Sequence, residues 1–448
     1  MLVVASIFVS PVLGAPDRSV EDRIRSAIEF IKGQYASNST IRGFLHGNST
    51  ALIYARDNGL AALALAAYHE THFSSEFYED LKHAVSFLLE ARAAHGDVYE
   101  FYDPVSERWG PGNDLYYWNS HVVMGVAYAA YAISEQVQSE RGYLSTIISR
   151  LRVCVDFWLP RKQLSNGAVA FSFPGGKARA DVAANGAMLV GLVYLSLFEH
   201  FWGDRSLAIR YATWSQSIAR WLWSLQERNQ TSWGWGGLYT NNSRTLQLTY
   251  ENAMAMFGLN KYYSAVGLLL AHYEPTFDQL RQSMTGWAEG FVDEMSDSWG
   301  GPRYGRSADG IIDYPKQTLA ASAVLQAMID VWINMGGPTD TRFGPPFHWP
   351  NAMRIYRWIT GANELSVDLQ SERDANGLGG GFAAGIGANR TIEGADIATT
   401  SLALYAFVRA SFVRIPEFFE GPLMLSIAFI LVTVAMVKRR INHPAAHT

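Results

Sequence analysis

The sequence predicts an all-α protein whose helices form a closed ring of six hairpins. Two observations carry this prediction. Six segments are apolar on almost every face, as buried helices are, whereas the segments between them are apolar on one face only. Each apolar segment also follows a loop rich in glycine and aromatic residues and begins close to a carboxylate. Because the two helices of a hairpin run antiparallel, the six buried helices point the same way and the loops before them share one mouth.

The one-sided helices carry apolar residues at spacings of three and four, with charged residues on much of the remaining surface. In the first of them, Ile24, Ala27, Ile28 and Ile31 form the apolar stripe. A second lies around residues 81–88, and later copies are predicted at residues 141–158, 205–225, 277–295 and 350–359.

The buried helices are predicted at residues 59–68, 121–133, 183–198, 253–269, 318–333 and 395–408. Small residues such as Gly125, Gly186 and Gly191 would let the backbones of these helices approach one another closely. The closed arrangement places these six helices inside and the one-sided six outside. An open α-solenoid is the alternative.

Hairpin count, alternation and the loop-then-carboxylate pattern together resemble the six-hairpin glycosidase-like (α/α)6 toroid superfamily, over roughly residues 19–412. No catalytic signature of a particular family accompanies the resemblance. It implies an (α/α)6 toroid with its site at the mouth.

The amino-acid composition and charge exclude several kinds of partner and site for this protein. The chain has 448 residues, of which 49% are apolar and 17% charged, and its net charge is -5. No basic stripe precedes the extreme C-terminus, so nucleic acid is not a predicted partner. The single Cys154 excludes an internal disulfide and is expected to be a small buried hydrophobe. No cofactor and no metal is predicted.

The two ends predict a cell-surface protein with one membrane anchor. Residues 1–14 are an apolar run with small residues where a signal peptidase would cut, and residues 15–415 would form the extracellular toroid. Residues 418–440 predict a transmembrane helix and a basic flank, which places residues 441–448 in the cytoplasm. Five Asn-X-Ser/Thr triplets fit an extracellular domain, at Asn38, Asn48, Asn229, Asn241 and Asn389.

Carboxylates near the starts of the buried helices are the candidate catalytic residues. A carboxylate at a helix start also caps free N–H groups, which explains most such residues without catalysis. Hydrolysis of a glycosidic bond needs two acids. Glu251 and Asp57 are the preferred pair, and four further acids remain open as partners: Asp313, Asp181, Asp114 and Asp396.

Aromatic residues in the same loops are the candidate substrate-binding groups, because a flat ring can stack on the apolar face of a pyranose. The alternative is that the rings pack onto the end of the barrel. His121 is a candidate for proton transfer, and with Tyr314 and Arg303 it would suit a lyase or an epimerase. The full set is Trp118, His121, Trp233, Trp235, Tyr250, Trp299, Arg303 and Tyr314.

The sequence thus predicts a membrane-anchored extracellular enzyme that acts on carbohydrate, with glycoside hydrolysis as the first choice. A polysaccharide lyase or epimerase on the same toroid is one alternative. A non-catalytic glycan-binding or cell-envelope protein is the other. Terpene-cyclase chemistry is disfavoured because no two aspartates are adjacent in the chain.

Overall fold

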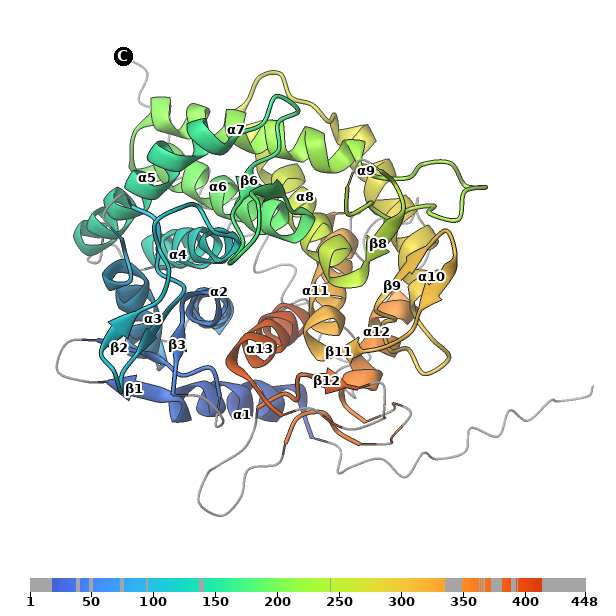
Figure 1. The fold of residues 1–448 in the computed structure, drawn as a ribbon, viewed down its shortest axis with the longest axis horizontal. Helices are drawn as coiled ribbons and strands as arrows, with labels where there is room; N and C mark the ends of the chain where they lie inside the picture. Colours follow the sequence, from blue (N-terminus) through green and yellow to red (C-terminus); the bar gives the residue numbers. More distant parts are fainter. Residues whose placement is uncertain are drawn as a thin grey trace, which may run out of the picture.

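A computed structural model gives the fold of the chain. It describes residues 18–37, 41–47, 51–72, 76–93, 96–136, 141–241, 243–334, 349–361, 363, 365, 367–371, 381–387, 392 and 394–412. Within these residues the helices form two concentric rings (Figure 1). The ring architecture predicted from the sequence is therefore confirmed.

The inner ring consists of six helices that pack side by side, and the last packs against the first. In ring order they are α2 (Ala55–His72), α4 (Tyr117–Gln136), α6 (Val182–Trp202), α8 (Thr249–Leu269), α11 (Thr318–Asn334) and α13 (Ile397–Phe412). The contact between α13 and α2 closes the circle, which excludes the open solenoid. The prediction that these helices are buried on all sides is also confirmed, since nearly every described side chain of α6 and α11 is inaccessible.

The outer ring covers the inner one with one-sided helices. They are α1 (Val20–Gly33), α3 (Tyr78–Glu90), α5 (Arg141–Lys162), α7 (Arg205–Ser224), α9 (Phe277–Gly286) and α12 (Trp349–Ile359). The helix predicted at residues 277–295 is interrupted: α9 passes into a π-helix, η2 (Trp287–Val292), and ends as α10 (Asp293–Met295). On α1, the buried Arg23 pairs with Asp368 at 2.8 Å, which ties the first helix to the segment before α13.

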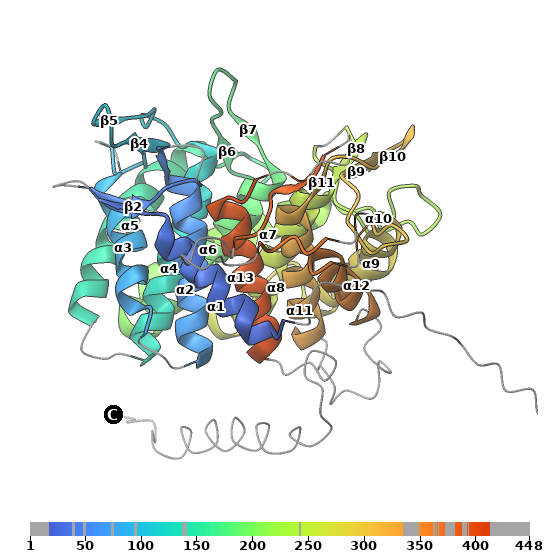
Figure 2. The ribbon, with the colours of Figure 1, turned by 90° about the horizontal axis from the view of Figure 1, so that it is seen from below.

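Short antiparallel strands lie at the end of the ring where the inner helices begin (Figure 2). The helical pattern of the sequence did not predict these strands. They pair as β1–β2, β3–β4–β5, β6–β7, β8–β9–β10 and β11–β12. Their bounds are β1 (Tyr35–Ser37), β2 (Arg42–Phe44), β3 (Ile53–Tyr54), β4 (Phe101–Asp103), β5 (Arg108–Trp109), β6 (Ala170–Phe171), β7 (Arg179–Ala180), β8 (Leu246–Leu248), β9 (Gly305–Ser307), β10 (Gly310–Ile312), β11 (Lys316–Gln317) and β12 (Gly385–Ile386).

The predicted signal peptide and membrane anchor lie outside the described residues. Within the described part, one helix, α6, is long and apolar enough to cross a bilayer, but it is wholly buried in the ring. Of the predicted glycosylation triplets, Asn229 and Asn241 lie in exposed loops, whereas Asn38, Asn48 and Asn389 lie outside the described residues. Cys154 is 3% exposed, and burial raises the pKa of its thiol to about 12, as a buried hydrophobe requires.

Glycines set the distance between inner helices. A Cβ atom at Gly125 of α4 would lie 2.0 Å from the carbonyl oxygen of Gly59 on α2. At Gly186 of α6 it would lie 2.4 Å from the carbonyl oxygen of Met254 on α8. Backbone atoms cannot yield as a flexible side chain does, so these positions exclude every other residue. The predicted close approach of the inner backbones is confirmed at both contacts.

We expect Gly125→Ala to destabilise the fold by about 3 kcal/mol or more, because the added methyl group must push α2 and α4 apart. Gly142→Ala on α5 is the matched control: it is also a helical glycine, and a Cβ there meets no atom within 4 Å. The control should be neutral or stabilise by up to about 1 kcal/mol. Urea unfolding followed by circular dichroism measures both, and equal stability of the two variants would contradict this account of helix spacing.

A buried asparagine fastens the preceding loop to three of the inner helices. Asn58, Asn185 and Asn252 are each the fourth residue of their helix and are completely inaccessible. Each side-chain amide accepts a hydrogen bond from the N–H of one loop residue and donates to the C=O of that same residue. The three loop residues are Phe44, Val169 and Leu238. We call this arrangement the asparagine clasp.

The amide of each clasp also donates to a backbone carbonyl four residues earlier, which satisfies its remaining N–H. Partial versions occur on two other inner helices. On α4, Asn119 accepts from the N–H of Val98 at 2.7 Å, and on α13, Thr400 accepts from the N–H of Phe382 at 3.0 Å. The repeat seen in the sequence therefore has a structural counterpart, which is one buried polar group near the start of five of the six inner helices.

Asn185→Ala should lower the free energy of unfolding by about 3 kcal/mol, because it leaves the buried N–H and C=O of Val169 without partners. The control is Asn166→Ala, which removes an exposed asparagine that accepts a single bond from the N–H of Ala168. That substitution should cost less than about 1 kcal/mol. If the two variants lose equal stability in thermal and urea unfolding, the clasp is not a fastening element.

Candidate functional site

The first part of the mouth is built around Asp57 on α2. One carboxylate oxygen lies 2.5 Å from Nδ1 of His46, and the other lies 3.6 Å from Nε of Arg56. This hydrogen bond raises the pKa of His46 against the opposing effect of burial. The Asp57 side chain is almost fully inaccessible, at 2% exposure. Asp57, predicted as a catalytic acid, is therefore buried here, and its two oxygens hold His46 and Arg56.

Two further acids cap their helices. Asp181 accepts from the N–H of Ala184 at 2.8 Å through one carboxylate oxygen, and Asp396 accepts from the N–H and hydroxyl of Thr399 at 2.7 and 2.8 Å. The expected capping role is thus present in both. Burial nevertheless raises the pKa of each carboxyl, and the nearby charge of Asp57 raises that of Asp396 further.

The carboxyl group of Glu251, on α8, differs in its hydrogen bonding from those of Asp57, Asp181 and Asp396. Its Oε2 atom is buried and has no hydrogen-bond partner, although part of the residue remains accessible. Burial, reinforced by the negative charge of Asp181, raises its pKa to about 8. The side chain is therefore protonated at neutral pH and can donate a proton. Because α8 follows α6 in the ring, Glu251 and Asp181 form a neighbouring acid pair.

The hairpin β6–β7 projects from the end of the ring at which the inner helices begin (Figure 2). Tyr117, the first residue of α4, stacks on Phe173 with ring centroids 5.2 Å apart. The guanidinium of Arg179 lies 4.5 Å from the Phe173 ring on its way towards the acid pair, and its charge opposes the rise in the pKa of both Glu251 and Asp181. Aromatic surface and charge therefore meet beside Glu251.

His121 lies beneath the mouth, where its Nε2 is 3.3 Å from the hydroxyl of Tyr250. Burial and the charge of Arg56 lower the pKa of His121 to about 3, so the ring is neutral at physiological pH. Burial raises the pKa of Tyr250 to about 12. The predicted partners of His121, Arg303 and Tyr314, are replaced in the structure by Arg56 and Tyr250.

Asp114 and Asp313 are not brought into this group. Asp114 pairs with Lys162 at 2.6 Å and accepts from the hydroxyl of Ser172 at 2.5 Å. Burial raises the pKa of Asp114, but these bonds outweigh it, and the pKa is lowered overall. Asp313 is half exposed and lies 3.8 Å from Nε of Arg303. A buried or proton-sharing acid role therefore fits neither residue.

The predicted aromatic residues divide between the rim and the packed wall. Trp118 is 1% exposed, donates from Nε1 to the carbonyl of Val98 at 2.7 Å and stacks on Tyr116. The ring of Trp118, a predicted substrate-binding residue, is therefore packed into the protein in this structure. Trp299 is 52% exposed on its loop, and Tyr314 is half-buried beneath the Lys316 ammonium group.

The tryptophans of the loop before α8 lie apart from the acid pair. Trp233 is half-buried and packs edge-on against Tyr239, with ring centroids 5.6 Å apart. Trp235 lines a cavity on the outer wall of the ring. Their adjacency to Glu251 in the sequence therefore does not place both rings beside Glu251 in the structure.

Four mouth residues were missed as candidates, namely His46, Arg56, Tyr117 and Arg179. His46 sits in a glycine-framed loop, and Arg56 and Tyr117 sit in helix starts, so position in the repeat was the available signal. Arg179 had no such signal, because only the β6–β7 pairing directs it to the mouth. Among the described residues, no three His, Cys, Asp or Glu side chains gather as metal ligands would.

The sequence matches no known protein-family model and none of the curated proteins. Solved structures do match the fold. A cellobiose 2-epimerase from Bacillus thermoamylovorans aligns with a TM-score of 0.60 at 12% identity, covering 87% of this chain and 98% of that one. A D-mannose isomerase aligns with a TM-score of 0.59 at 13% identity, covering 89% and 99%.

A third similar structure is an α-1,6-mannanase of Salegentibacter in complex with α-1,6-mannotriose, with a TM-score of 0.52 at 12% identity, covering 88% of this chain and 100% of that one. That mannanase is an inactive variant in which two adjacent aspartates are replaced by asparagine. No two aspartates are adjacent in this chain, and the acids of the mouth come from the starts of different helices. The chain therefore shares the (α/α)6 toroid fold of these structures.

The raised pKa of Glu251 predicts that this residue lowers the free energy of unfolding by an amount that depends on pH. The folded protein holds this proton up to about pH 8, whereas an unfolded glutamate loses it near pH 4.5. The contribution of Glu251 to stability therefore falls as pH rises between these values. We expect Glu251→Gln to gain stability relative to the parent protein from pH 5 to 8, by on the order of 1–3 kcal/mol. Urea unfolding at several pH values measures the difference, and a difference that does not change with pH would contradict the shift.

Proposed function

We propose that the chain is a carbohydrate-active enzyme that works at the mouth of the toroid and hydrolyses glycosidic bonds. Glu251 would donate the proton to the leaving oxygen, and Asp181 would act as the ionised partner. The observation that carries this proposal is the carboxyl group of Glu251, which holds its proton at neutral pH and has an oxygen without a hydrogen-bond partner.

Two carboxyl groups can act as acid and base together when their surroundings give them different pKa values, so that one is protonated while the other is ionised. Burial raises the pKa of both acids, but Asp181 keeps two backbone N–H contacts that oppose the rise, and Glu251 has none. Asp181 therefore ionises first, and its charge then holds the proton on Glu251. The cap on α6 uses one oxygen of Asp181, which leaves the other for a water molecule or an anomeric carbon.

The surroundings of the pair suit a sugar. Phe173 and Tyr117 offer flat apolar surface, whereas Arg179 and the hydroxyl of Tyr250 can bind sugar hydroxyl groups. The similar structures include a cellobiose 2-epimerase and an α-1,6-mannanase, which supports a carbohydrate substrate. The predicted extracellular location and membrane anchor belong to the same proposal, supported by the triplets at Asn229 and Asn241 and by residues 418–440.

In a test with α-1,6-mannobiose, cellobiose and their longer oligomers, Glu251→Gln should lower the rate of reducing-end release about 100-fold or more, and Asp181→Asn by a comparable factor. Activity of the parent protein should fall above about pH 8, where Glu251 loses its proton. Asp313→Asn is the control, since Asp313 lies at the rim outside the acid pair, and it should retain most activity. Full activity of Glu251→Gln would rule out this assignment.

An epimerase or isomerase is the second candidate, favoured by the hydrogen bond between neutral His121 and the Tyr250 hydroxyl beside Arg56. The Tyr250 hydroxyl, held by its hydrogen bond to His121, could exchange a proton with the sugar while Arg56 stabilises negative charge on a sugar oxygen. Reaction in D2O separates the two functions: epimerisation through proton removal places deuterium on a sugar carbon, whereas hydrolysis leaves every C–H bond intact. Deuterium incorporation that Tyr250→Phe abolishes would establish the second function.

A further inference from the structure

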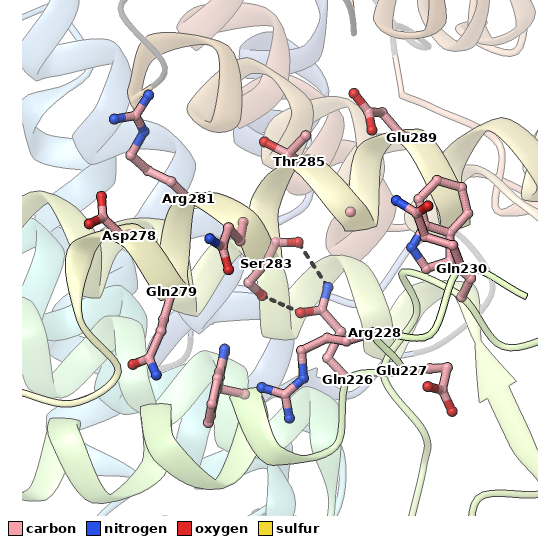
Figure 3. A pocket seen from close by; sticks show the side chains of 14 residues that line it. Gln226, Glu227, Arg228, Gln230, Asp278, Gln279, Arg281, Ser283, Thr285 and Glu289 are labelled. Atoms are coloured by element: carbon pink, nitrogen blue, oxygen red, sulfur yellow. Dashed lines mark hydrogen bonds between the residues drawn. The ribbon is translucent and has the colours of Figure 1, made fainter. Parts of the chain in front are cut away.

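A cavity of about 570 Å³ lies on the outer wall of the ring, between the end of α7 and the outward side of α9 (Figure 3). Its volume falls within the range of roughly 300–1,000 Å³ typical of ligand sites. Figure 3 shows Asp278 and Arg281 towards one end of the cavity and Glu289 towards the other. The acid pair of the mouth does not line it. We call this cavity the outer groove.

We propose that the outer groove is a second carbohydrate-binding site, distinct from the mouth. The proposal does not depend on the mouth being catalytic. It rests on the floor, the rings and the polar side chains of the groove, and on an asparagine at its edge.

The floor of the outer groove is a fixed polar contact. Gln226 is 2% exposed, and its amide nitrogen donates to the carbonyls of Gly236 and Ser283 at 2.8 Å each. Its oxygen accepts from the Ser283 hydroxyl at 2.5 Å. These bonds join the end of α7 to α9, so the groove has a defined shape before any ligand arrives.

Two half-buried tryptophans form part of the walls. The guanidinium carbon of Arg228 lies 3.8 Å from the centre of the Trp223 ring, which fixes a flat cationic and aromatic surface. A Cβ atom at Gly290 of the π-helix would lie 2.6 Å from the Trp235 ring, so that ring packs directly on the helix backbone. π-helical turns occur often at functional sites. Rigid rings of this kind bind the apolar face of a pyranose.

The remaining lining favours sugar over other ligand chemistries. No described residue that lines the outer groove is aliphatic, so its apolar surface comes from the two tryptophan rings and the carbon stems of polar side chains. Carboxylates and amides outnumber the cations, which disfavours a phosphate or a nucleic acid. Asp278, Gln282 and Glu289 instead provide acceptors and donors for hydroxyl groups around the two rings.

Asn229, a predicted glycosylation site, lies at the edge of the outer groove. It heads an Asn-Gln-Thr triplet, is exposed and lies between two lining residues, Arg228 and Gln230. Its N–H donates to the Glu227 carboxylate at 2.9 Å, which fixes its backbone at this edge. A glycan attached to Asn229 and a free oligosaccharide present the same chemistry to the groove.

The first arm of the test uses full-length Asn229→Gln protein and measures its affinity for mannotriose, cellotriose and chitotriose by calorimetry. Trp223→Ala or Glu289→Gln in this background should weaken binding at least 10-fold. Arg205→Ala, an exposed change at the start of α7, is the matched control and should leave affinity unchanged. Glu251→Gln should leave the Trp223-dependent part of the binding in place, which separates the groove from the mouth.

The second arm uses protein secreted by a eukaryotic host and compares amide hydrogen exchange before and after enzymatic removal of the glycan at Asn229. Faster exchange in residues 226–236 and 278–290 after removal would identify the attached glycan as the occupant. Trp223→Ala should show the faster exchange already. Thermal unfolding confirms that each variant is folded.

The proposal is overturned if no trisaccharide binds and glycan removal leaves exchange unchanged. It is equally overturned if trisaccharide binding survives Trp223→Ala and Glu289→Gln but is lost in Glu251→Gln, because the sugar then occupies the mouth. Binding of a protein to the outer groove without any effect of sugar would contradict it as well.

Discussion

The asparagine clasp is the interaction on which the mouth of this protein depends. Asn58, Asn185 and Asn252 each satisfy both backbone groups of one loop residue inside an apolar ring, where an unpaired N–H or C=O is costly. The loops that carry aromatic and charged residues are thereby fixed to helices that cannot move apart. A mouth assembled from loops thus acquires the rigidity of the helices beneath it, which a binding or catalytic arrangement requires.

The inner ring of apolar helices also determines the pKa values of the acids at the end where these helices begin. Acids at the starts of the inner helices lose part of their hydration, which is the main reason that the pKa values of Glu251, Asp181 and Asp396 rise. Asp114 is the counterexample, since its bonds to Lys162 and Ser172 reverse the effect. Towards the other end of the same helices, buried charges are paired, as in the contact of Lys261 with Asp330 at 3.1 Å. Carboxyl groups whose pKa values are raised by burial are therefore found at the mouth.

The two sugar sites that we propose would use the ring differently. At the mouth, side chains from consecutive inner helices converge, so Glu251 of α8 meets Asp181 of α6. The outer groove instead uses two neighbouring outer-ring segments and the loop that carries Trp235. That loop was predicted to serve the mouth through both of its tryptophans. In the structure, Trp235 lines the outer groove, whereas Trp233 packs against Tyr239.

Much of the architecture was predictable, because helical periodicity and all-round apolarity report burial directly: the two rings, the closely approaching glycines and the capping acids all follow from local sequence. The sequence also marked each helix start but attributed the repeat to its carboxylates, whereas the structural repeat is the buried asparagine beside them. Tertiary structure alone decided that Asp57 and Trp118 are inaccessible, that Arg56 and Tyr250 accompany His121, and that Arg179 reaches the acid pair. The physical reason is that burial and charge proximity depend on which helices become neighbours, and the packing of helices far apart in the chain decides that, as where Gly125 of α4 meets Gly59 of α2.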